Sequence, residues 1–150
     1  MFQRILVGYD GSNGGKAALE RAAVMAREYE ARLTAVWVRE PLPRHSDLPG
    51  EFEGEKEAAD GYFKERCEEI KVAAKQHGVD IRCLAHCGHP AKTLVKFADE
   101  GGYDLIVVGH SDHSELWGRL LGDTADRIAD HAHCSVLVVK QPETSPGRQA

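Results

Sequence analysis

Residues 105–124 read LIVVGHSDHSELWGRLLGDT, and this stretch decides how the rest of the chain is interpreted. Its first four residues are apolar, which is typical of a buried strand, and the segment after Gly122 has the apolar spacing of a helix. A strand, a glycine-bearing loop and a helix N-terminus together form a geometry that binds phosphate. Loop N–H groups and the positive end of the helix dipole both face the anion. The stretch therefore predicts an α/β unit with an anion-binding loop.

The composition fits one folded domain. The chain has 150 residues, of which 42% are hydrophobic and 29% are charged, as in globular proteins. No apolar run approaches the roughly 20 residues that cross a bilayer, and the first residues lack the pattern of a secretory signal. We therefore expect a cytoplasmic protein without membrane contact, with a single domain over residues 1–140 and a flexible polar tail over residues 141–150.

Charge and cysteine usage narrow the possible partners. A net charge of −5 argues against a nucleic-acid partner, because domains that bind nucleic acid are typically basic. The four cysteines form no Cys-x-x-Cys pair and are interpreted as reduced thiols. Cys83, Cys87 and His89 are close in sequence, but they lack a fourth ligand, so we expect no metal site.

Five apolar segments alternate with helical patterns along the chain. The first and fourth segments are uniformly apolar, as central strands are, and the third alternates as an edge strand does. Residues 41–61 contain three prolines and predict a surface loop that leads into the second helix. The alternation predicts a parallel, doubly wound α/β sheet with right-handed crossovers. The predicted strands are Gln3–Tyr9, Leu33–Val38, Ile81–His86, Leu105–Gly109 and Ser135–Lys140.

Two loops are candidates to line a ligand crevice. Doubly wound sheets bind ligands beyond the C-terminal ends of their strands, where the strand order reverses. The loop Asp10-Gly11-Ser12 follows the first strand, and the loop that begins at Gly109 follows the fourth. His110 and His113 are candidate phosphate contacts in the second loop. No Ser-His-Asp order, paired-carboxylate site or Walker lysine emerges, so we expect no catalytic residue.

The chain resembles the universal stress protein family over residues 2–140. The matching pieces are ILVGYDGS at 5–12, GHPAKTLVKFA at 88–98, DLIVVGHSDHSELWGRLLGDTADRI at 104–128 and CSVLVVK at 134–140. The resemblance implies an adenine nucleotide alpha hydrolase-like fold, with five strands in the order 3-2-1-4-5 and helices on both faces. It also implies a homodimer through the edge strand Ser135–Lys140, and a role in stress response or signalling with a further, unidentified partner.

Family members that bind ATP carry Gly, two residues, Gly, nine residues, Gly and then Ser or Thr. Gly109 and Gly122 match this motif, whereas Asp112 replaces the second glycine and Asp123 replaces the hydroxyl residue. The family's first-strand aspartate, which approaches the adenosine, is retained as Asp10. The resemblance thus implies a crevice for ATP with Mg²⁺. Its residues would be Asp10, Gly11, Val38 (whose backbone would meet adenine), Gly109, His110, Asp112, His113, Gly122, Asp123 and Thr124.

The two substituted aspartates leave the function open. Unit charges about 5 Å apart at an effective dielectric constant near 20 repel by ~3 kcal/mol, or about two hundredfold in affinity. Asp112 and Asp123 would therefore oppose a triphosphate, unless Asp123 caps its own helix or Asp112 reaches the phosphates through Mg²⁺. Three functions remain: a non-enzymatic nucleotide-binding signalling module, a slow ATPase or nucleotidyl-transfer enzyme that holds Mg²⁺ with Asp10, Asp112 and Asp123, and an interaction protein with an empty crevice.

Overall fold

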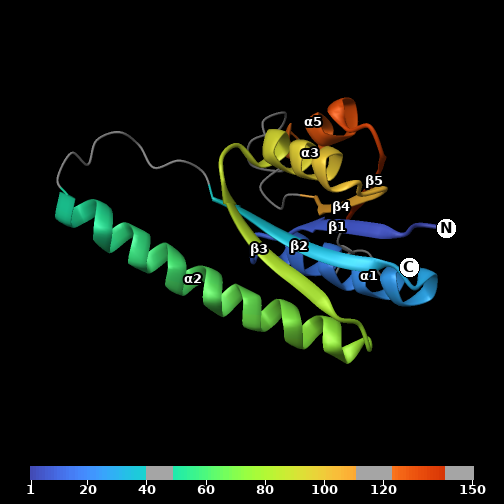
Figure 1. The fold of residues 1–150 in the computed structure, drawn as a ribbon, viewed down its shortest axis with the longest axis horizontal. Helices are drawn as coiled ribbons and strands as arrows, with labels where there is room; N and C mark the ends of the chain where they lie inside the picture. Colours follow the sequence, from blue (N-terminus) through green and yellow to red (C-terminus); the bar gives the residue numbers. More distant parts are fainter. Residues whose placement is uncertain (40–48, 111–122, 141–150) are drawn as a thin grey trace, which may run out of the picture.

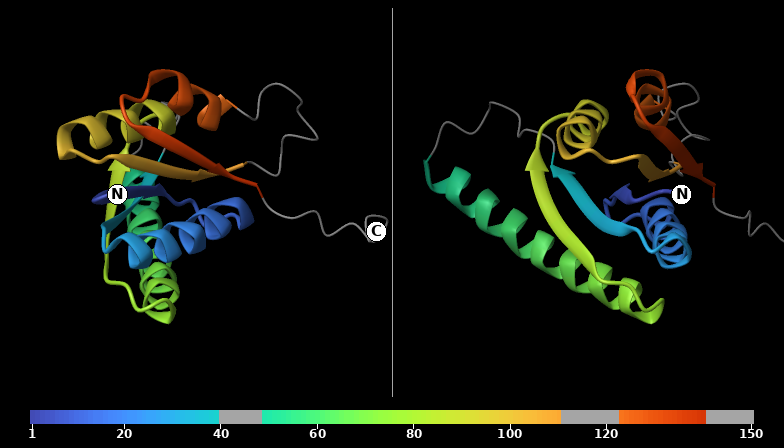
Figure 2. Two further views of the ribbon diagram at one scale, coloured as in Figure 1. Left: turned by 90° about the vertical axis from the view of Figure 1, so that its right-hand side faces the viewer. Right: turned by 45° about the vertical axis from the view of Figure 1, so that its right-hand side comes forward.

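A computed structural model describes residues 1–39, 49–110 and 123–140. Five parallel strands form one sheet in the order β3-β2-β1-β4-β5, with helices on both faces (Figures 1 and 2). The predicted α/β fold and strand order are confirmed. The strands are β1 (Arg4–Gly8), β2 (Arg32–Arg39), β3 (Ile81–Cys87), β4 (Leu105–Gly109) and β5 (Ser135–Val139). The helices of the described residues are α1 (Asn13–Tyr29), α2 (Pro49–Gln76), α3 (Pro90–Gly101) and α5 (Asp123–His131).

The sheet separates two hydrophobic cores. Helices α1 and α2 cover one face, and α3 and α5 cover the other (Figure 2). Successive residues of β1 serve the two cores in turn: Ile5 and Val7 pack toward α1, and Leu6 packs toward α3 and α5. All three are fully buried. Burial on both faces explains why the central strands are continuous apolar runs.

The edge strands occupy the expected positions. The more polar strand β3 closes one edge of the sheet, and β5 closes the other. No residue of β3 is fully buried and its last three residues are exposed, whereas the last four residues of β5 are half-buried. The prediction that the third strand lies at an edge is therefore confirmed.

Helix α2 begins earlier than the sequence pattern indicates. Residues 41–61 were expected to form a loop, but residues 49–61 are helical, and residues 40–48 lie outside the described residues. Pro49 is compatible with a helix at the first position, because the N–H that proline lacks has no partner there. The glutamate, lysine and alanine residues that follow favour a helix. The first turns of α2 stand clear of the sheet (Figure 1).

The apolar spacing of the sequence predicts that Tyr29 lies on the buried stripe of α1, with Ala18, Ala22, Met25 and Ala26, and that Ala129 lies on the buried stripe of α5. The predictions for Tyr29 and Ala129 are wrong. Tyr29, in the last turn of α1, is 39% exposed, and Ala129 of α5 is also exposed. The buried face of α1 is wider than the predicted stripe and also includes Leu19 and Ala23. The small residues of this face let α1 pack close to the sheet.

The cysteines are free thiols. Burial, followed by a hydrogen bond with Cys67, raises the pKa of Cys83 to about 12, so this thiol stays protonated at neutral pH. Across residues 1–39, 49–110 and 123–140, no group of three histidine, cysteine or acidic residues could hold a metal ion. No helix in these ranges is long and apolar enough to span a membrane.

Candidate functional site

The strand order reverses between β1 and β4. The chain leaves β1 into α1 on one face of the sheet, and the helix that follows β4, α5, lies on the other face. Neighbouring strands with such diverging connections open a crevice beyond their C-terminal ends. Asp10 and Gly11 follow β1, while Gly109 and His110 stand at the end of β4. The structure thus brings these four predicted site residues together at the C-terminal ends of β1 and β4.

Asp10 shapes the loop after β1. Its Oδ1 accepts hydrogen bonds from the backbone N–H of Ser12 at 2.9 Å and from the Ser12 hydroxyl at 2.5 Å. The Ser12 hydroxyl oxygen accepts a hydrogen bond from the N–H of Gly15 at 3.1 Å and caps α1. Gly11 has a φ of 83°, a conformation that side chains rarely adopt. Asp10 therefore links the end of β1 to the first turn of α1.

Helix α1 and strand β4 meet backbone to backbone. A Cβ added to Gly14 would lie 2.5 Å from the carbonyl oxygen of His110, and one added to Gly109 would overlap the backbone of Gly14. Glycine is therefore required at both positions for this approach. The contact places the first turn of α1, with the positive end of its dipole, beside the end of β4, where it favours an anion.

Val38 lies on the other side of Asp10. Gly8 of β1 pairs with Val36 of β2, and the same register carried two residues further places Val38 level with Asp10. The Val38 side chain packs against the core on the side of α3 and α5. The contact of its backbone with adenine stays a prediction.

Side chains of α2 contact the loop after β1, and the sequence pattern did not reveal these contacts. The Tyr62 hydroxyl donates a hydrogen bond to the carbonyl oxygen of Asp10 at 2.9 Å, and a Cβ on Gly11 would lie 2.8 Å from that hydroxyl. The Arg66 guanidinium carbon lies 4.5 Å from the centre of the Tyr62 ring. Trp37 of β2 also contacts Tyr62, with ring centroids 5.0 Å apart. These contacts hold α2 against the loop after β1.

Glu69 connects α2 to β1. The Tyr9 hydroxyl donates a hydrogen bond to its carboxylate at 3.1 Å, and Arg66 pairs with the same carboxylate at 3.1 Å. Burial, and then the bond to Glu69, raise the pKa of Tyr9 above its ordinary value. The Glu69 side chain is 42% exposed, so it holds both partners while remaining on the solvated face of α2. The detectable signal was the spacing of Tyr62, Arg66 and Glu69 at i, i+4 and i+7, which puts all three on one helix face.

Comparison with known proteins supplies the family. The model of the universal stress protein family matches residues 1–140. The chain belongs to this family. A universal stress protein from Methanocaldococcus jannaschii is 35% identical over 147 residues, which cover 95% of this chain and 85% of the relative. The resemblance noted from the sequence is therefore confirmed.

Solved structures of universal stress proteins share the fold. One in complex with cAMP has a TM-score of 0.74 and 33% identity, covering 96% of this chain and 99% of the other. A universal stress protein from Lactobacillus plantarum has a TM-score of 0.80 and 25% identity, covering 92% of this chain and 97% of the other. Both comparisons extend over nearly the whole domain and include the strands that flank the crevice.

The remaining predicted site residues of this universal stress protein fall into two groups. Thr124 is exposed in the first turn of α5 and lines a hollow between α3 and α5. Helix α5 begins at Asp123, so this residue is the first of the helix, one position beyond its expected place as N-cap. Asp112, His113 and Gly122 lie outside the described residues, as does the rest of the predicted phosphate loop up to that glycine.

Replacing Tyr62 with phenylalanine tests the contact between α2 and the crevice loop. The change removes the hydrogen bond to the Asp10 carbonyl and leaves the ring, so we expect the free energy of unfolding to fall by about 0.5–1.5 kcal/mol. Urea denaturation measures the loss. The Tyr29→Phe variant removes the hydroxyl of a similarly exposed tyrosine and should match the wild type. Equal stability of the two variants would show that the bond contributes nothing.

Proposed function

We propose that this universal stress protein binds an adenine nucleotide with a single phosphate group in the crevice between β1 and β4. It acts as a non-enzymatic stress-response or signalling module in the cytoplasm. The observation that carries the proposal is the backbone contact between Gly14 and Gly109, which sets a helix N-terminus beside the end of β4. The solved relative that is 33% identical over nearly the whole chain holds cAMP, a nucleotide of this class.

The adenosine end of the ligand fits the loop after β1. The Asp10 carboxylate is exposed at the crevice and is held in place by Ser12, so it is positioned to accept hydrogen bonds from ribose hydroxyls. The backbone of Val38, level with Asp10, offers polar groups to the edge of adenine. Tyr62 stabilises this half of the site from α2 through the Asp10 carbonyl.

The phosphate end of the ligand determines the nucleotide class. In the family's ATP-binding motif, this chain has Asp112 in place of a glycine and Asp123 in place of a hydroxyl residue. Each added carboxylate repels a triphosphate more strongly than a single phosphate group, because the triphosphate carries more negative charge. ATP with Mg²⁺ is the alternative ligand of the same crevice, with the metal bridging carboxylate and phosphate oxygens.

Calorimetric titration tests the proposal, after the absorbance at 260 nm has excluded nucleotide carried over from purification. We expect cAMP or AMP to bind with a dissociation constant in the micromolar range, and MgATP to bind about tenfold more weakly or worse. Absence of binding by all three nucleotides at millimolar concentration would refute the proposal and favour an interaction protein. Steady phosphate release from ATP that Asp112→Ala abolishes would instead support the enzyme.

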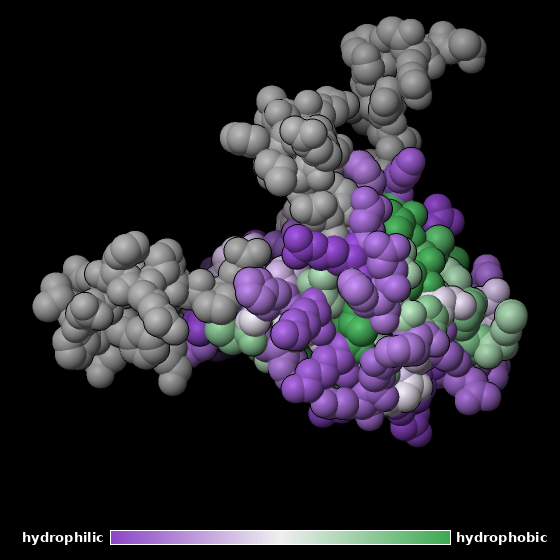
Figure 3. Space-filling view, turned by 90° about the horizontal axis from the view of Figure 1, so that it is seen from above, coloured by the Kyte–Doolittle hydropathy of each residue, from purple (hydrophilic) through white to green (hydrophobic). Residues whose placement is uncertain are grey.

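We also propose a homodimer through β5. The carbonyl oxygen of Val139 accepts the N–H of His110, so the backbone groups of Val139 face β4 and those of Val138 face the open edge. An open apolar edge strand favours pairing with a second copy. Hydrophobic surface also shows among hydrophilic side chains on the side of α3 and α5 (Figure 3).

Light scattering should give a dimeric mass at micromolar concentration, and Val138→Pro, which removes an outward donor, should give a monomer. A monomeric wild type would contradict the dimer.

A further inference from the structure

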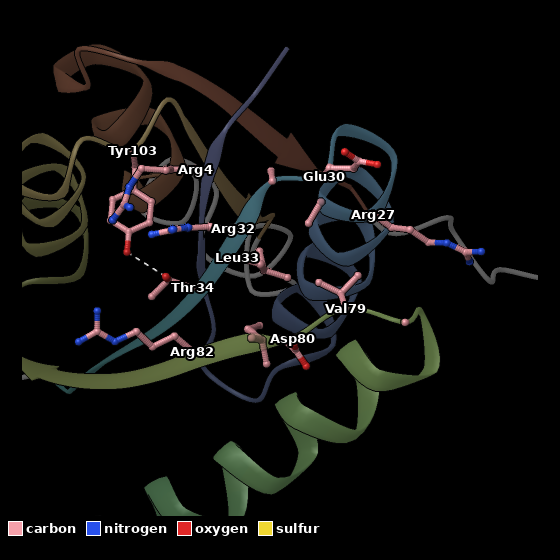
Figure 4. A pocket seen from close by; sticks show the side chains of 14 residues that line it. Arg4, Arg27, Glu30, Arg32, Leu33, Thr34, Val79, Asp80, Arg82 and Tyr103 are labelled. Carbon is pink, nitrogen blue, oxygen red and sulfur yellow. Dashed lines mark hydrogen bonds between the residues drawn. The ribbon is translucent and has the colours of Figure 1, made fainter.

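Three arginines lie together at the end of the sheet opposite the crevice, where strands β1, β2 and β3 begin (Figure 4). Arg4 and Arg32 are register partners on β1 and β2, and Arg82 of β3 pairs with Thr34, two residues beyond Arg32. Residues two apart on a strand share a face, and neighbouring strands lie about 4.8 Å apart. The three side chains therefore rise from the same face of adjacent strands, within reach of one small ligand.

The three arginines have no ion-pair partner among the residues that the structure describes. No carboxylate in residues 1–39, 49–110 and 123–140 forms an ion pair within 4.0 Å of Arg4, Arg32 or Arg82. The Asp104 carboxylate is engaged by backbone N–H groups, at 3.0 Å from that of Arg4 and 2.8 Å from that of Gln3. Like charges on directly paired strand positions are destabilising, so an anion bound between Arg4 and Arg32 would relieve their repulsion.

Acidic residues are present in the same pocket but stand apart from the row. Glu30 and Asp80 line the pocket next to the C-terminal end of α1 and the start of β3. In Figure 4 their carboxylates lie on the side of α1, whereas Arg4, Arg32 and Arg82 extend toward Tyr103 and away from them. The pocket, of about 750 Å³, is thus divided into a mixed-charge end and an arginine end.

At the arginine end of the pocket, Arg4 packs against the ring of Tyr103. The Arg4 guanidinium carbon lies 4.8 Å from the centre of the Tyr103 ring. The Tyr103 hydroxyl donates a hydrogen bond to the hydroxyl oxygen of Thr34 at 2.8 Å, and both residues are buried. The Nε of Arg4 is buried and has no hydrogen-bond partner among the described residues. The ring contact restrains a guanidinium whose Nε has no hydrogen-bond partner within the described part of the chain.

We propose that this pocket binds an oxyanion with two or more negative charges, a small molecule that carries phosphate or carboxylate groups, between Arg4, Arg32 and Arg82. Guanidinium groups present paired N–H donors whose geometry matches both phosphate and carboxylate oxygens. The pocket lies at the N-terminal edge of the sheet, opposite the crevice between β1 and β4. It is a second site, and its occupancy is independent of the proposed nucleotide.

Calorimetry at constant ionic strength tests the site with two probes, pyrophosphate and citrate. We expect at least one probe to bind with a dissociation constant below about 1 mM. Binding of pyrophosphate alone would assign phosphate-bearing ligands, binding of citrate alone would assign carboxylate-bearing ligands, and binding of both would show recognition by charge. Absence of binding by either probe at about 10 mM would overturn the proposal.

Two matched variants locate the binding. Arg32→Gln/Arg82→Gln removes two exposed cations of the row and should weaken the probe by about tenfold or more. Arg21→Gln/Lys75→Gln removes two exposed cations outside the pocket and should bind the probe as the wild type does. If the first variant binds like the wild type, the anion sits elsewhere, the nucleotide crevice included, and the proposal is wrong. Should the double variant not fold, each single variant provides the same comparison.

Discussion

The Gly109→Ala variant is expected to lose about 3 kcal/mol of stability and its nucleotide binding together. The added Cβ would overlap the backbone of Gly14, so α1 and the end of β4 must move apart. Backbone cannot give way as the tip of a flexible side chain can, which is why one methyl group has so large an effect here. Separation also withdraws the first turn of α1 from the place where the phosphate is proposed to bind. Urea denaturation and titration with cAMP measure the two losses.

The Gly61→Ala variant is the matched control for this experiment. Gly61 lies within α2, and a Cβ there has no heavy atom within 4 Å. Alanine favours a helix over glycine, so this variant should be more stable than the wild type by roughly 0.5–1 kcal/mol. The opposite signs separate a steric effect from a general effect of replacing glycine. If Gly109→Ala were also stabilised, α1 and β4 would not approach as closely as the structure shows.

The fold was predictable because parallel sheets impose strong local patterns. Central strands such as β1 and β4 are buried on both faces and therefore appear as apolar runs, while β3 at the sheet edge is more polar and more exposed. The early start of α2 was not predictable in the same way. Pro49 and the glycines after it are typical of loops. The helix-forming residues along the rest of α2 outweigh this local preference.

The adjacency of Asp10 and Gly109 was predictable from the sequence, but the side chains that pack around them were not. Asp10 lies two residues after β1 and Gly109 ends β4, and the parallel arrangement brings these strand ends together without further information. Tyr62 reaches the Asp10 carbonyl only because a particular face of α2 lands on the end of β1. That docking depends on the packing of Trp37 and neighbouring side chains, which local spacing does not encode.

The cluster of three arginines at the start of β1, β2 and β3 likewise could not be predicted from local sequence. Arg4, Arg32 and Arg82 are distant in sequence, and each alone is an ordinary charged residue at the start of a strand. Only the strand order and the register bring them together. The two proposed anion sites thus lie at opposite ends of the strands, one built on a helix N-terminus and backbone and the other on guanidinium groups.

Restoring the family motif should change which nucleotide this protein prefers. In the Asp112→Gly/Asp123→Ser variant the two added carboxylates are gone, so the affinity for MgATP should rise by up to about two hundredfold. The affinity for cAMP should rise far less, because a single phosphate group is repelled less. Titration of both nucleotides measures the ratio of their affinities. Asp126→Ser/Asp130→Ser removes the same charge from exposed positions of α5 and should leave that ratio unchanged. Equal gains for MgATP and cAMP would mean that the aspartates act through the net charge of the protein and do not select the nucleotide.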